Sequence, residues 1–529
     1  MSVLKTNIRR FIAMGISACC FWAANGPAAT WAASPSSPMT DTGQIICYGN
    51  SGPMTCPAPG RVFFGQDANY AAAPMAYKDN GDGTITDLVT GLMWSRAVNA
   101  EKSSLTGAEK EARTLTLGGY SDWRVPTIKE LYSLINFSGN TGVARPGSSG
   151  RVPGAVPYIN TDYFNFKYGN TRAGERYIDA QWLSSTRYVS YTMERNFTLF
   201  GVNFADGRIK GYGYGNSGMR KEKKFYVRFV RGNAYGQNQF HSNGDGTVMD
   251  LATGLTWMQA DSGRTMSWEA ALAYTGDATH GGHTDWRLPN AKELQFIVDY
   301  SRSPDTTDSA AIDPIFSATS ITNEAGQKDY AHYWTSTSHL DGRRPGDSAV
   351  TVCFGRALGK MHGRIMDVHG AGAQRSDPKT GSNAIGHGPQ GDARRSKNMV
   401  RLVRGGDVTI VTRPRSSDRS RYPFVVNVDK GYEAMASGSS GGQGFSRPGS
   451  NRPGSRERFG NSSQGGRSLG RTPGGQGFVN RLDRNGDNRV SKTEFDGPPS
   501  HFSRFDRNRD GYITEDEAPT GPPPGKRQP

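Results

Sequence analysis

The chain has 529 residues, enough for about three domains, with 35% hydrophobic residues, 21% charged residues and 68 glycines. This composition excludes a membrane-embedded bundle and favours loop-rich globular domains joined to disordered chain. The net charge of +15 suits nucleic acid, an anionic membrane or an acidic polysaccharide. Much of the arginine, however, lies in a late Gly/Ser tract, so the charge belongs partly to the tail.

The N-terminus has the pattern of a signal peptide at residues 1–32. A basic start precedes an uncharged, mostly apolar stretch at 11–24, and Ala32 ends a cleavage site. This stretch is too short to span a bilayer. Ile16–Cys19 resembles a lipoprotein box, which leaves lipid anchoring as the alternative. We therefore expect export to the periplasm, the cell surface or the medium, with no transmembrane segment.

Two of the five cysteines would be lost with the signal peptide. Cys47 and Cys56 enclose a short Gly/Pro-containing loop in a lead-in segment at 33–78. An oxidising compartment favours a disulfide between them, and two free thiols are the alternative. Cys353 lies in an apolar run and is expected at a buried strand position.

A long internal repeat organises the middle of the chain. Trp94 to Trp257 and Asp122 to Asp285 both span 163 residues, and the segments around them match. The matching segments are Asn80–Trp94 with Asn243–Trp257, Asp122–Pro126 with Asp285–Pro289, and, in outline, Trp182–Thr186 with Trp334–Ser338. This period is too long for a solenoid. The sequence therefore predicts two homologous domains at 79–232 and 241–405.

Each copy carries signals for hairpins and short helices. The Asn-Gly-Asp-Gly segments are typical of hairpin turns. Thr127 with Glu130, and Asn290 with Glu293, form the pattern of a capping box that opens a helix. A further helix is expected at Trp268–Ala273. Strands and long loops follow, so we predict an α+β domain with two helices and a twisted antiparallel sheet.

The repeated elements resemble the Lcl C-terminal domain family, named after a collagen-like bacterial adhesin. They are Thr-Gly-Leu-x-Trp, Asp-Trp-Arg-[Val/Leu]-Pro-x-x-x-Glu-Leu, Trp-x-Ser-[Ser/Thr] and a closing Val-Arg-[Phe/Leu]-Val-Arg, within about residues 79–405. The second element is also similar to C-type-lectin-like folds. The resemblance implies two C-type-lectin-like domains that recognise glycans at a surface. It gives no strong reason to expect catalysis.

The residue inventory limits the chemistry of the repeats. Residues 57–240 contain neither His nor Cys, so the first copy cannot use a Ser-His-Asp or Cys-His mechanism. Asp122 with Glu130, or Asp285 with Glu293, are candidate acid/base pairs. The simpler interpretation is structural, with each Glu capping its helix and each Asp holding a turn or the following Arg.

The second copy contains a group of histidines whose spacing matches no tight metal motif, so surface or loop positions are expected: His332, His339, His362 and His369. If glycans bind, the loops at Tyr158–Tyr168 and Tyr188–Tyr214 offer the needed Tyr and Asn side chains. They equally suit ordinary loops, and no single residue is nominated there.

The C-terminal part changes character. Residues 406–478 are predicted to be a flexible basic linker, because its Gly/Ser/Arg-rich tract cannot bury a core. An EF-hand pair is predicted at 479–518 and a disordered tail at 519–529. Export makes an anionic glycan a better partner for the linker than nucleic acid, and a plain tether is simpler than either.

Two loops in this part follow the calcium-binding ligand pattern, which needs oxygen ligands at loop positions 1, 3, 5, 7, 9 and 12. The first loop supplies Asp483, Asn485, Asp487, the Arg489 carbonyl, Ser491 and Glu494. The second supplies Asp506, Asn508, Asp510, the Tyr512 carbonyl, Thr514 and Glu517. We expect a short β-bridge between the loops at position eight, and a small core of phenylalanines.

Together these patterns predict an α+β protein with two tandem C-type-lectin-like domains, a disordered linker and a small α-helical EF-hand pair. The predicted function is that of an exported calcium-binding protein that recognises and adheres to a glycan or an extracellular matrix polysaccharide at a surface, with no catalytic residue and Ca²⁺ as the cofactor. The alternatives are an enzyme that acts on polysaccharide through carboxylates, and a structural envelope protein whose tail calcium rigidifies.

Overall fold

The computed structural model describes residues 35–411, apart from 100, 144–151, 216–221 and 277. In the C-terminal part it describes 479, 482, 489–492, 494–495, 502, 505–508, 510–514 and 517. The chain divides into two compact units, 1–441 and 442–529. The predicted signal peptide, the tail at 519–529 and the predicted linker beyond residue 411 lie outside the described residues.

Both copies begin with the same four-stranded antiparallel sheet. In the first copy its order is β10-β6-β5-β4, and in the second it is β11-β12-β13-β23. The strands are β4 (Tyr77–Asp79), β5 (Thr84–Asp87), β6 (Met93–Ser95), β10 (Val230–Arg231), β11 (Phe240–Ser242), β12 (Thr247–Asp250), β13 (Leu255–Met258) and β23 (Val403–Gly405). Gly83 and Gly246 sit at the predicted hairpin turns with φ of +87° and +83°, a conformation that favours glycine.

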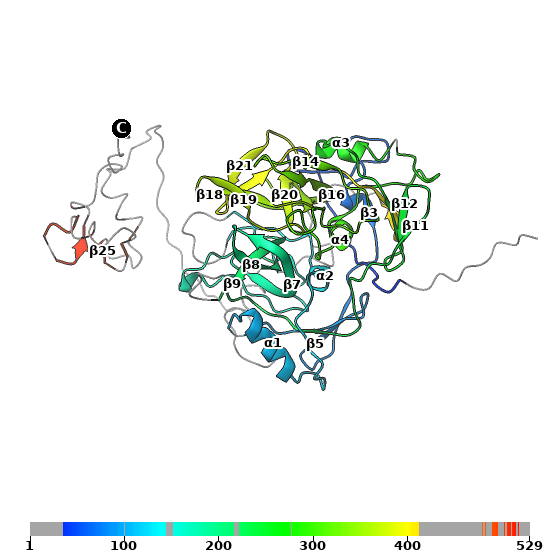
Figure 1. Cartoon of the computed structure of the whole chain (residues 1–529). Helices are drawn as coiled ribbons and strands as arrows, with labels where there is room; N and C mark the ends of the chain where they lie inside the picture. The colour runs from blue at the N-terminus through cyan, green and yellow to red at the C-terminus, as the bar shows by residue number, and fades with distance from the viewer. Residues whose placement is uncertain are drawn as a thin grey trace, which may run out of the picture. The chain divides into compact units, whose positions relative to one another are not determined.

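Two short helices follow in each copy, as the capping patterns predict. They are α1 (Leu105–Thr114) and α2 (Ile128–Ser133) in the first copy, and α3 (Trp268–Ala273) and α4 (Ala291–Phe296) in the second. The capping boxes at Thr127/Glu130 and Asn290/Glu293 are both formed. In Figure 1, α1 and α3 lie at opposite ends of the unit, whereas α2 and α4 lie side by side near its centre.

A six-stranded antiparallel sheet joins the two copies. Its order is β16-β17-β20-β9-β8-β7. The strands are β7 (Gln181–Thr192), β8 (Asn196–Asn203), β9 (Arg208–Gly215), β16 (His332–His339), β17 (Ser348–Cys353) and β20 (Gln374–Pro378). The copies meet where Ile209 of β9 pairs with Gln374 of β20. Each copy therefore contributes a three-stranded meander, and the two meanders form one sheet.

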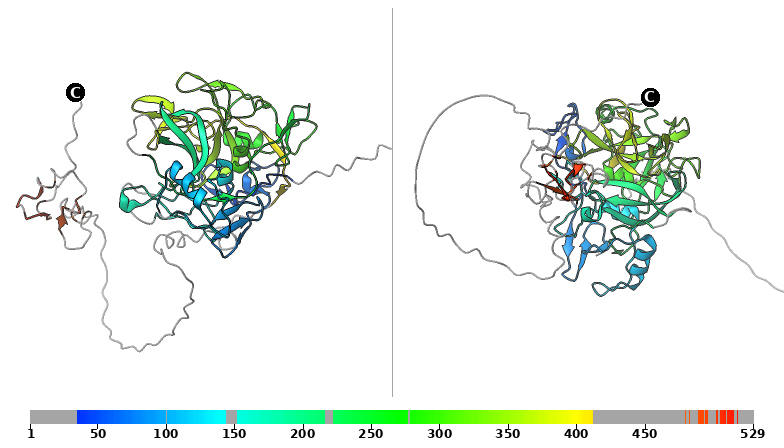
Figure 2. Two further views of the ribbon diagram at one scale, coloured as in Figure 1. Left: turned by 60° about the horizontal axis from the view of Figure 1, so that its bottom comes forward. Right: turned by 90° about the vertical axis from the view of Figure 1, so that its left-hand side faces the viewer.

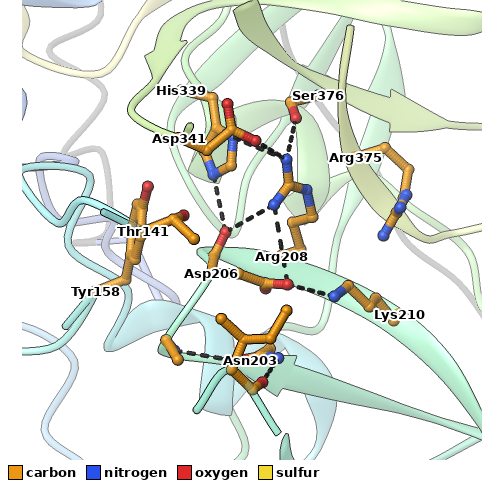
Figure 3. Close-up of polar contacts among 12 residues, drawn as sticks. Thr141, Tyr158, Asn203, Asp206, Arg208, Lys210, His339, Asp341, Arg375 and Ser376 are labelled. Carbon is orange, nitrogen blue, oxygen red and sulfur yellow. Dashed lines mark hydrogen bonds and ion pairs between the residues drawn. The ribbon is translucent and has the colours of Figure 1, made fainter. Parts of the chain in front are cut away.

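A polar network crosses this junction (Figure 3). Arg208 of β9 ion-pairs with Asp341 of the second copy and donates a hydrogen bond to Ser376 at 2.6 Å. His339 Nε2 donates to the carbonyl oxygen of Asp206 at 2.9 Å. Burial, and then the Arg208 charge, lower the pKa of His339, so its imidazole is neutral at pH 7. The network thus fixes the two meanders against each other without an unpaired histidine charge.

The remaining strands cover the second copy and the lead-in. A four-stranded sheet of order β19-β18-β22-β21 is inserted after β17. Its strands are β18 (Leu358–Met361), β19 (Arg364–Asp367), β21 (Ala384–His387) and β22 (Asp392–Arg394). Three two-stranded sheets pair β1 (Cys47–Tyr48) with β2 (Pro53–Met54), β14 (Ser320–Thr322) with β15 (Lys328–Tyr330), and β3 (Tyr70–Ala71) with β24 (Thr409–Ile410). Short 3₁₀ turns lie at Asp67–Asn69 and Thr171–Ala173.

The lead-in segment binds closely to the second copy. Gln44 exchanges two hydrogen bonds with Ser338, its Nε2 donating to the carbonyl oxygen and its Oε1 accepting from the N–H, both at 2.7 Å. The buried Lys379 ammonium donates to the Tyr48 carbonyl at 3.0 Å. The same ammonium lies 3.7 Å from the ring centroid of Trp268. These buried contacts make the lead-in part of the fold of the second copy. The blue ribbon of the lead-in runs along the first unit in the views of Figure 2.

In the C-terminal unit the two calcium-type loops pair through β25 (Val490–Ser491) and β26 (Tyr512–Ile513). Val490 faces Ile513, which is the predicted bridge at position eight. The described core residues of this unit are Val479, Leu482, Val490, Phe502 and Ile513, with Phe495 and Phe505 packed against them. The expected phenylalanine core is therefore present.

The predicted α+β class is wrong, because the protein is mostly β-sheet. Within the described residues of the first unit only four α-helices occur, each of six to ten residues, whereas 26 strands occur in the described parts of the chain. The two copies also share one six-stranded sheet, so they are not two separate domains. The C-type-lectin-like character and the EF-hand pair are not shown. In the second unit the described residues Val479, Leu482, Phe502 and Phe505 are helical. The sequence underestimates the strand content because some hairpin turns lack the usual glycine signal. The β7–β8 hairpin, for example, turns at Met193 and Glu194, which have φ of 50° and 70°.

Candidate functional site

The second calcium-type loop is the best-described candidate site, because all six predicted ligand residues are described. Gly511 has φ of +89° and makes the sharp turn that this loop type requires. Its N–H donates to Asp506 Oδ2 at 3.2 Å. The N–H groups of Asp510 and Tyr512 donate to the side chains of Asn508 and Asp510, both at 2.9 Å. These internal bonds curl the loop around its own oxygen atoms.

Asp506 holds the most informative atom of the loop. Only 6% of this residue is exposed, and Oδ2 accepts the bond from Gly511. The other oxygen, Oδ1, is buried and has no hydrogen-bond partner in the described part of the chain. A buried carboxylate oxygen without a partner is costly. A cation bound at loop position one would satisfy it.

Glu517 closes the loop at position twelve. Its Oε1 accepts from the N–H groups of Arg507 and Asn508 at 3.0 and 3.1 Å, and its Oε2 accepts from the Thr514 N–H and hydroxyl at 3.1 and 3.0 Å. Desolvation opposes ionisation, but these bonds from Thr514 and Asn508 prevail and lower the pKa of Glu517. The carboxylate is therefore ionised at neutral pH, as a calcium ligand must be.

The first loop is described only in part. Glu494 is 7% exposed, and its Oε2 accepts from the Ser491 N–H at 2.9 Å and hydroxyl at 2.7 Å. These contacts match those of Thr514 and Glu517 in the second loop. Asp483, Asn485 and Asp487 lie outside the described residues. Across the described positions, no group of three or more His, Cys, Asp or Glu side chains is gathered as a metal cluster.

The candidate acid/base carboxylates of the repeats are engaged in structural contacts. The Glu130 oxygens accept two bonds from Arg124 at 2.5 and 2.6 Å, and Glu293 accepts two from Arg287 at 2.6 and 2.7 Å. Each Glu also accepts the N–H of its helix cap at 2.8 Å. The predicted capping role of both glutamates is confirmed.

Asp122 and Asp285 do not pair with the arginines that follow them in sequence, Arg124 and Arg287. Asp122 pairs with Arg231 at 2.6 Å and Asp285 pairs with Arg404 at 2.7 Å. Each of these arginines lies in the closing strand of its own copy. The hydrogen bond from Arg231 lowers the pKa of Asp122, and that from Arg404 lowers the pKa of Asp285. Both aspartates therefore tie the closing strand to the Trp-Arg-Pro segment.

The expected surface location of the histidines is wrong for three of the four. His332, His339 and His369 are buried, and only His362 is exposed. His332 lies 3.4 Å from Asp377, and His369 lies 3.1 Å from Asp392. Burial and the Arg375 charge lower the pKa of His369 to about 4. Buried and exposed residues do not alternate along β16, because both faces of this strand are covered. His332 and His339, at its two ends, are therefore both buried.

The two aromatic segments proposed for glycan contact behave differently. Tyr158–Tyr168 contributes to the core, with Tyr158 and Phe164 fully buried. Within Tyr188–Tyr214, by contrast, Tyr191 and Phe197 are 49% and 48% exposed. They face each other across β7 and β8 with ring centroids 5.4 Å apart, and Tyr214 follows at 6.5 Å from Phe197. Val189 adds a further exposed apolar side chain. We call Val189, Tyr191, Phe197 and Tyr214 the aromatic platform.

The cysteines occupy two kinds of position. Cys47 and Cys56 form a disulfide with Cα atoms 5.1 Å apart. Cys353 is a free, fully buried thiol in β17, which confirms the expected strand position. Burial raises the pKa of the Cys353 thiol well above its usual value, so it is protonated and inert at neutral pH.

Comparison with protein families identifies the repeats. The model described as the Lcl C-terminal domain matches residues 83–231 and 246–368, just over half of the chain. The chain belongs to the Lcl C-terminal domain family. Searches of curated proteins and of solved structures found no match. None of the helices that the structure describes is long and apolar enough to cross a bilayer.

The structure refines how the two Lcl C-terminal domain copies correspond. Ser185 and Ser336 each donate an N–H bond of 2.8 Å to the carbonyl of the Trp-Arg-x-Pro proline. Thr186 and Thr337 each accept an N–H bond of 3.0 Å from the first residue of α2 or α4. Thr186 therefore corresponds to Thr337, and Trp182 corresponds to Tyr333. The outline match of Trp182 to Trp334 is displaced by one residue.

Proposed function

We propose that this protein binds calcium through its two C-terminal loops. The observation that carries the proposal is the buried, unpartnered Asp506 Oδ1 inside a loop whose every ligand position holds oxygen. Calcium is a hard cation that takes six to eight oxygen ligands. Asp506, Asn508, Asp510, the Tyr512 carbonyl, Thr514 and Glu517 would hold it in the second loop. The equivalent residues from Asp483 to Glu494 would serve the first.

Bound calcium would stabilise a unit whose core is small. The C-terminal unit has five buried apolar residues in its described core, which is too few to give much stability without help. A ligand at ten times its Kd stabilises the folded state by about 1.4 kcal/mol. Extracellular calcium modules bind at roughly 10⁻⁴–10⁻³ M, which suits an exported protein with a disulfide.

Calorimetric calcium titration of the full chain tests this function. We expect saturable binding of about two ions, because two loops carry the pattern. Glu517→Gln should abolish binding at the second loop, and Glu494→Gln at the first. Asp122→Asn removes an exposed carboxylate far along the chain from both loops and serves as the matched control. The absence of binding at millimolar calcium would refute the proposal.

A second proposed function, recognition of an acidic glycan without catalysis, is favoured by the aromatic platform. Exposed rings stack on the C–H faces of sugars. Two such rings, Tyr191 and Phe197, lie together at one end of β7–β9, with the partly buried ring of Tyr214 next to Phe197. Arg187 and Arg195 are exposed on the same hairpin, and the chain is strongly basic. An isolated surface ring needs no explanation, but a contiguous aromatic group marks an interaction site.

Binding to heparin and to uncharged dextran measures this recognition. We expect heparin to bind and the double variant Tyr191→Ser with Phe197→Ser to bind roughly tenfold more weakly, since two ring contacts are lost. Leu88→Ser, which removes another exposed apolar side chain of the first copy, should leave binding unchanged. Equal weakening by both variants, or hydrolysis of the polysaccharide, would contradict recognition at the platform.

A further inference from the structure

A cavity of about 370 Å³ opens where the two copies meet. It lies beside the start of α2, the linker between the copies and the segment that follows α4. Its lining includes Lys129, Thr186, Tyr235, Asn238, Asp299 and Tyr300. We call this space the seam cavity. Residues of both copies line it, so neither copy alone would form it.

The second copy contains a matching place, which we call the twin site. The repeat offset of 163 pairs Lys129 with Lys292 and Phe137 with Tyr300. Thr186 and Thr337 match through their equal bonds from the helix starts. Asp250 of the second copy lies near Lys129, and Asp87 of the first lies near Lys292. The two places are therefore related by the approximate symmetry of the repeats.

A segment of the protein itself fills the twin site. Lys292 Nζ donates to Thr40 Oγ1 at 2.7 Å and to the Asp41 carbonyl at 2.9 Å. The Phe137 N–H donates to the Thr42 carbonyl at 2.8 Å. All of these acceptors belong to the lead-in, an extended stretch of peptide.

A carboxylate completes the filling of the twin site. The Thr337 hydroxyl donates to Asp67 Oδ2, which also accepts from the Thr42 hydroxyl at 2.8 Å. Asp67 is 5% exposed. The donors of the twin site are thus matched by two main-chain carbonyls, a hydroxyl and a carboxyl group of the lead-in, and by the Ser133 carbonyl, which accepts from Lys292 at 3.0 Å.

The equivalent donors in the seam cavity are largely unmatched. Lys129 Nζ donates to Asn238 Oδ1 at 2.7 Å and lies 5.1 Å from the Phe296 ring centroid. Among the described residues, neither the Thr186 hydroxyl nor the Tyr300 N–H has an acceptor. A ligand for this cavity must therefore bring hydrogen-bond acceptors.

The carboxylates in the lining do not supply those acceptors. Asp299 Oδ1 accepts from the N–H of Ser301 at 2.9 Å and from its hydroxyl at 2.6 Å. Asp313 Oδ1 accepts from the Ile315 N–H at 2.8 Å. Each of these contacts holds a local turn, and Asn136 makes the same turn contacts at the twin site. The acidic groups of the lining are therefore scaffold.

We propose that the seam cavity binds an extended acidic peptide segment from a partner, in the way that the lead-in fills the twin site. A main-chain carbonyl of the ligand would accept from the Tyr300 N–H, and its carboxylate would accept from the Thr186 hydroxyl and Lys129. A peptide is favoured over a sugar acid because the filled twin uses main-chain carbonyls as well as a carboxylate.

The charge state of Lys129 gives this site a pH signature. Desolvation lowers the pKa of Lys129 to about 8, against the opposing charges of Asp250 and Asp299. The other charged groups near the cavity are the side chains of Asp250, Asp299 and Asp313. Binding of an acidic peptide should therefore weaken as the pH rises through 8.

Titration of the full chain with two peptide pools tests the proposal. Both are acetylated, amidated pentapeptides with varied flanks, one with a central Asp and one with a central Asn. We expect saturable binding of the Asp pool, roughly tenfold weaker binding of the Asn pool, and a similar loss for Thr186→Val, since a charge-assisted bond is removed each time. Thr186→Ser keeps the hydroxyl and should bind within twofold of the natural chain.

The comparison of the two pools needs no protein variant, so it stands even if Thr186→Val unfolds. Equal binding of both pools would overturn the proposal, and so would the absence of binding. Binding of free glucuronic acid at Thr186 in place of the peptides would also overturn it and assign the cavity to a sugar acid. Heparin binding through the aromatic platform is a separate measurement, so either result can fail alone.

Discussion

The two Lcl C-terminal domain copies share a framework but differ in what covers it. Their first sheets, capping boxes and Arg–Glu pairs are the same. In the second copy the strands β16 and β17 are buried throughout, and the lead-in fills the twin site. In the first copy the end of β7–β8 is exposed, and the seam cavity beside α2 opens between the two copies. Segments outside the shared framework thus decide which copy offers surfaces to a partner.

The Arg–Glu pairs give the sharpest contrast between the copies. The Arg287 and Glu293 side chains are 7% and 5% exposed, whereas Arg124 is 37% exposed beside a buried Glu130. Arg287 is covered by the lead-in, where its guanidinium lies 5.7 Å from the Tyr70 ring centroid. The Arg287–Glu293 pair is therefore more desolvated than the Arg124–Glu130 pair, although the two pairs make the same hydrogen bonds.

The largest predicted effect concerns these pairs. Glu293→Ala should lower the free energy of unfolding by about 3–5 kcal/mol, because it leaves the buried Arg287 charge unpaired. Glu130→Ala should cost only about 1–2 kcal/mol, mainly through the lost cap, since water reaches Arg124. Urea unfolding of the two variants measures the difference. Equal losses would show that the lead-in does not distinguish the copies.

A smaller effect is predicted for the pH dependence that Asp67 gives to the twin site. Desolvation and the neighbouring Asp41 raise the pKa of Asp67 to about 7, although the Thr337 and Thr42 hydroxyls oppose this. An unfolded Asp titrates near 3.9, so between about pH 4 and 7 the unfolded state has lost this proton and the folded state keeps it. Stability should fall by about 1.4 kcal/mol per pH unit in that range and be level above it.

Asp67→Asn should remove this fall while keeping an oxygen for both threonines. Asp82→Asn is the control, because hydrogen bonds from Thr84 lower the pKa of Asp82 and its contribution is lost only below about pH 4. Chemical unfolding at several pH values records both slopes. An unchanged slope in Asp67→Asn would mean that another group titrates.

The smallest effect is expected at the aromatic platform. Tyr191→Ser and Phe197→Ser should each change the free energy of unfolding by about 0.5 kcal/mol or less, because both rings are half exposed. Thermal unfolding measures this directly. A large loss would show that the rings pack against the body of the first copy and are not held free for a ligand.

Local features of this protein are readable from its sequence. The caps of α2 and α4 depend on a side chain and an acid three residues apart, and the first hairpins depend on glycine between two strands. The ligand spacing of Asp506 to Glu517 is also local, and so is the apolar run around Cys353. Each of these features rests on contacts within about a dozen residues, so the sequence alone determines it.

Only the tertiary structure decided which surfaces are open. The strands β9 and β20, which pair Ile209 with Gln374, are separated by more than 150 residues, and this pairing joins the strands of the two copies into one sheet. Burial of His339, exposure of Tyr191 and the opening of the seam cavity between the two copies follow from that long-range packing. Side chains of the same type are buried or exposed according to which distant segment covers them. A local sequence pattern does not contain this information, because the covering segment lies far away in the sequence.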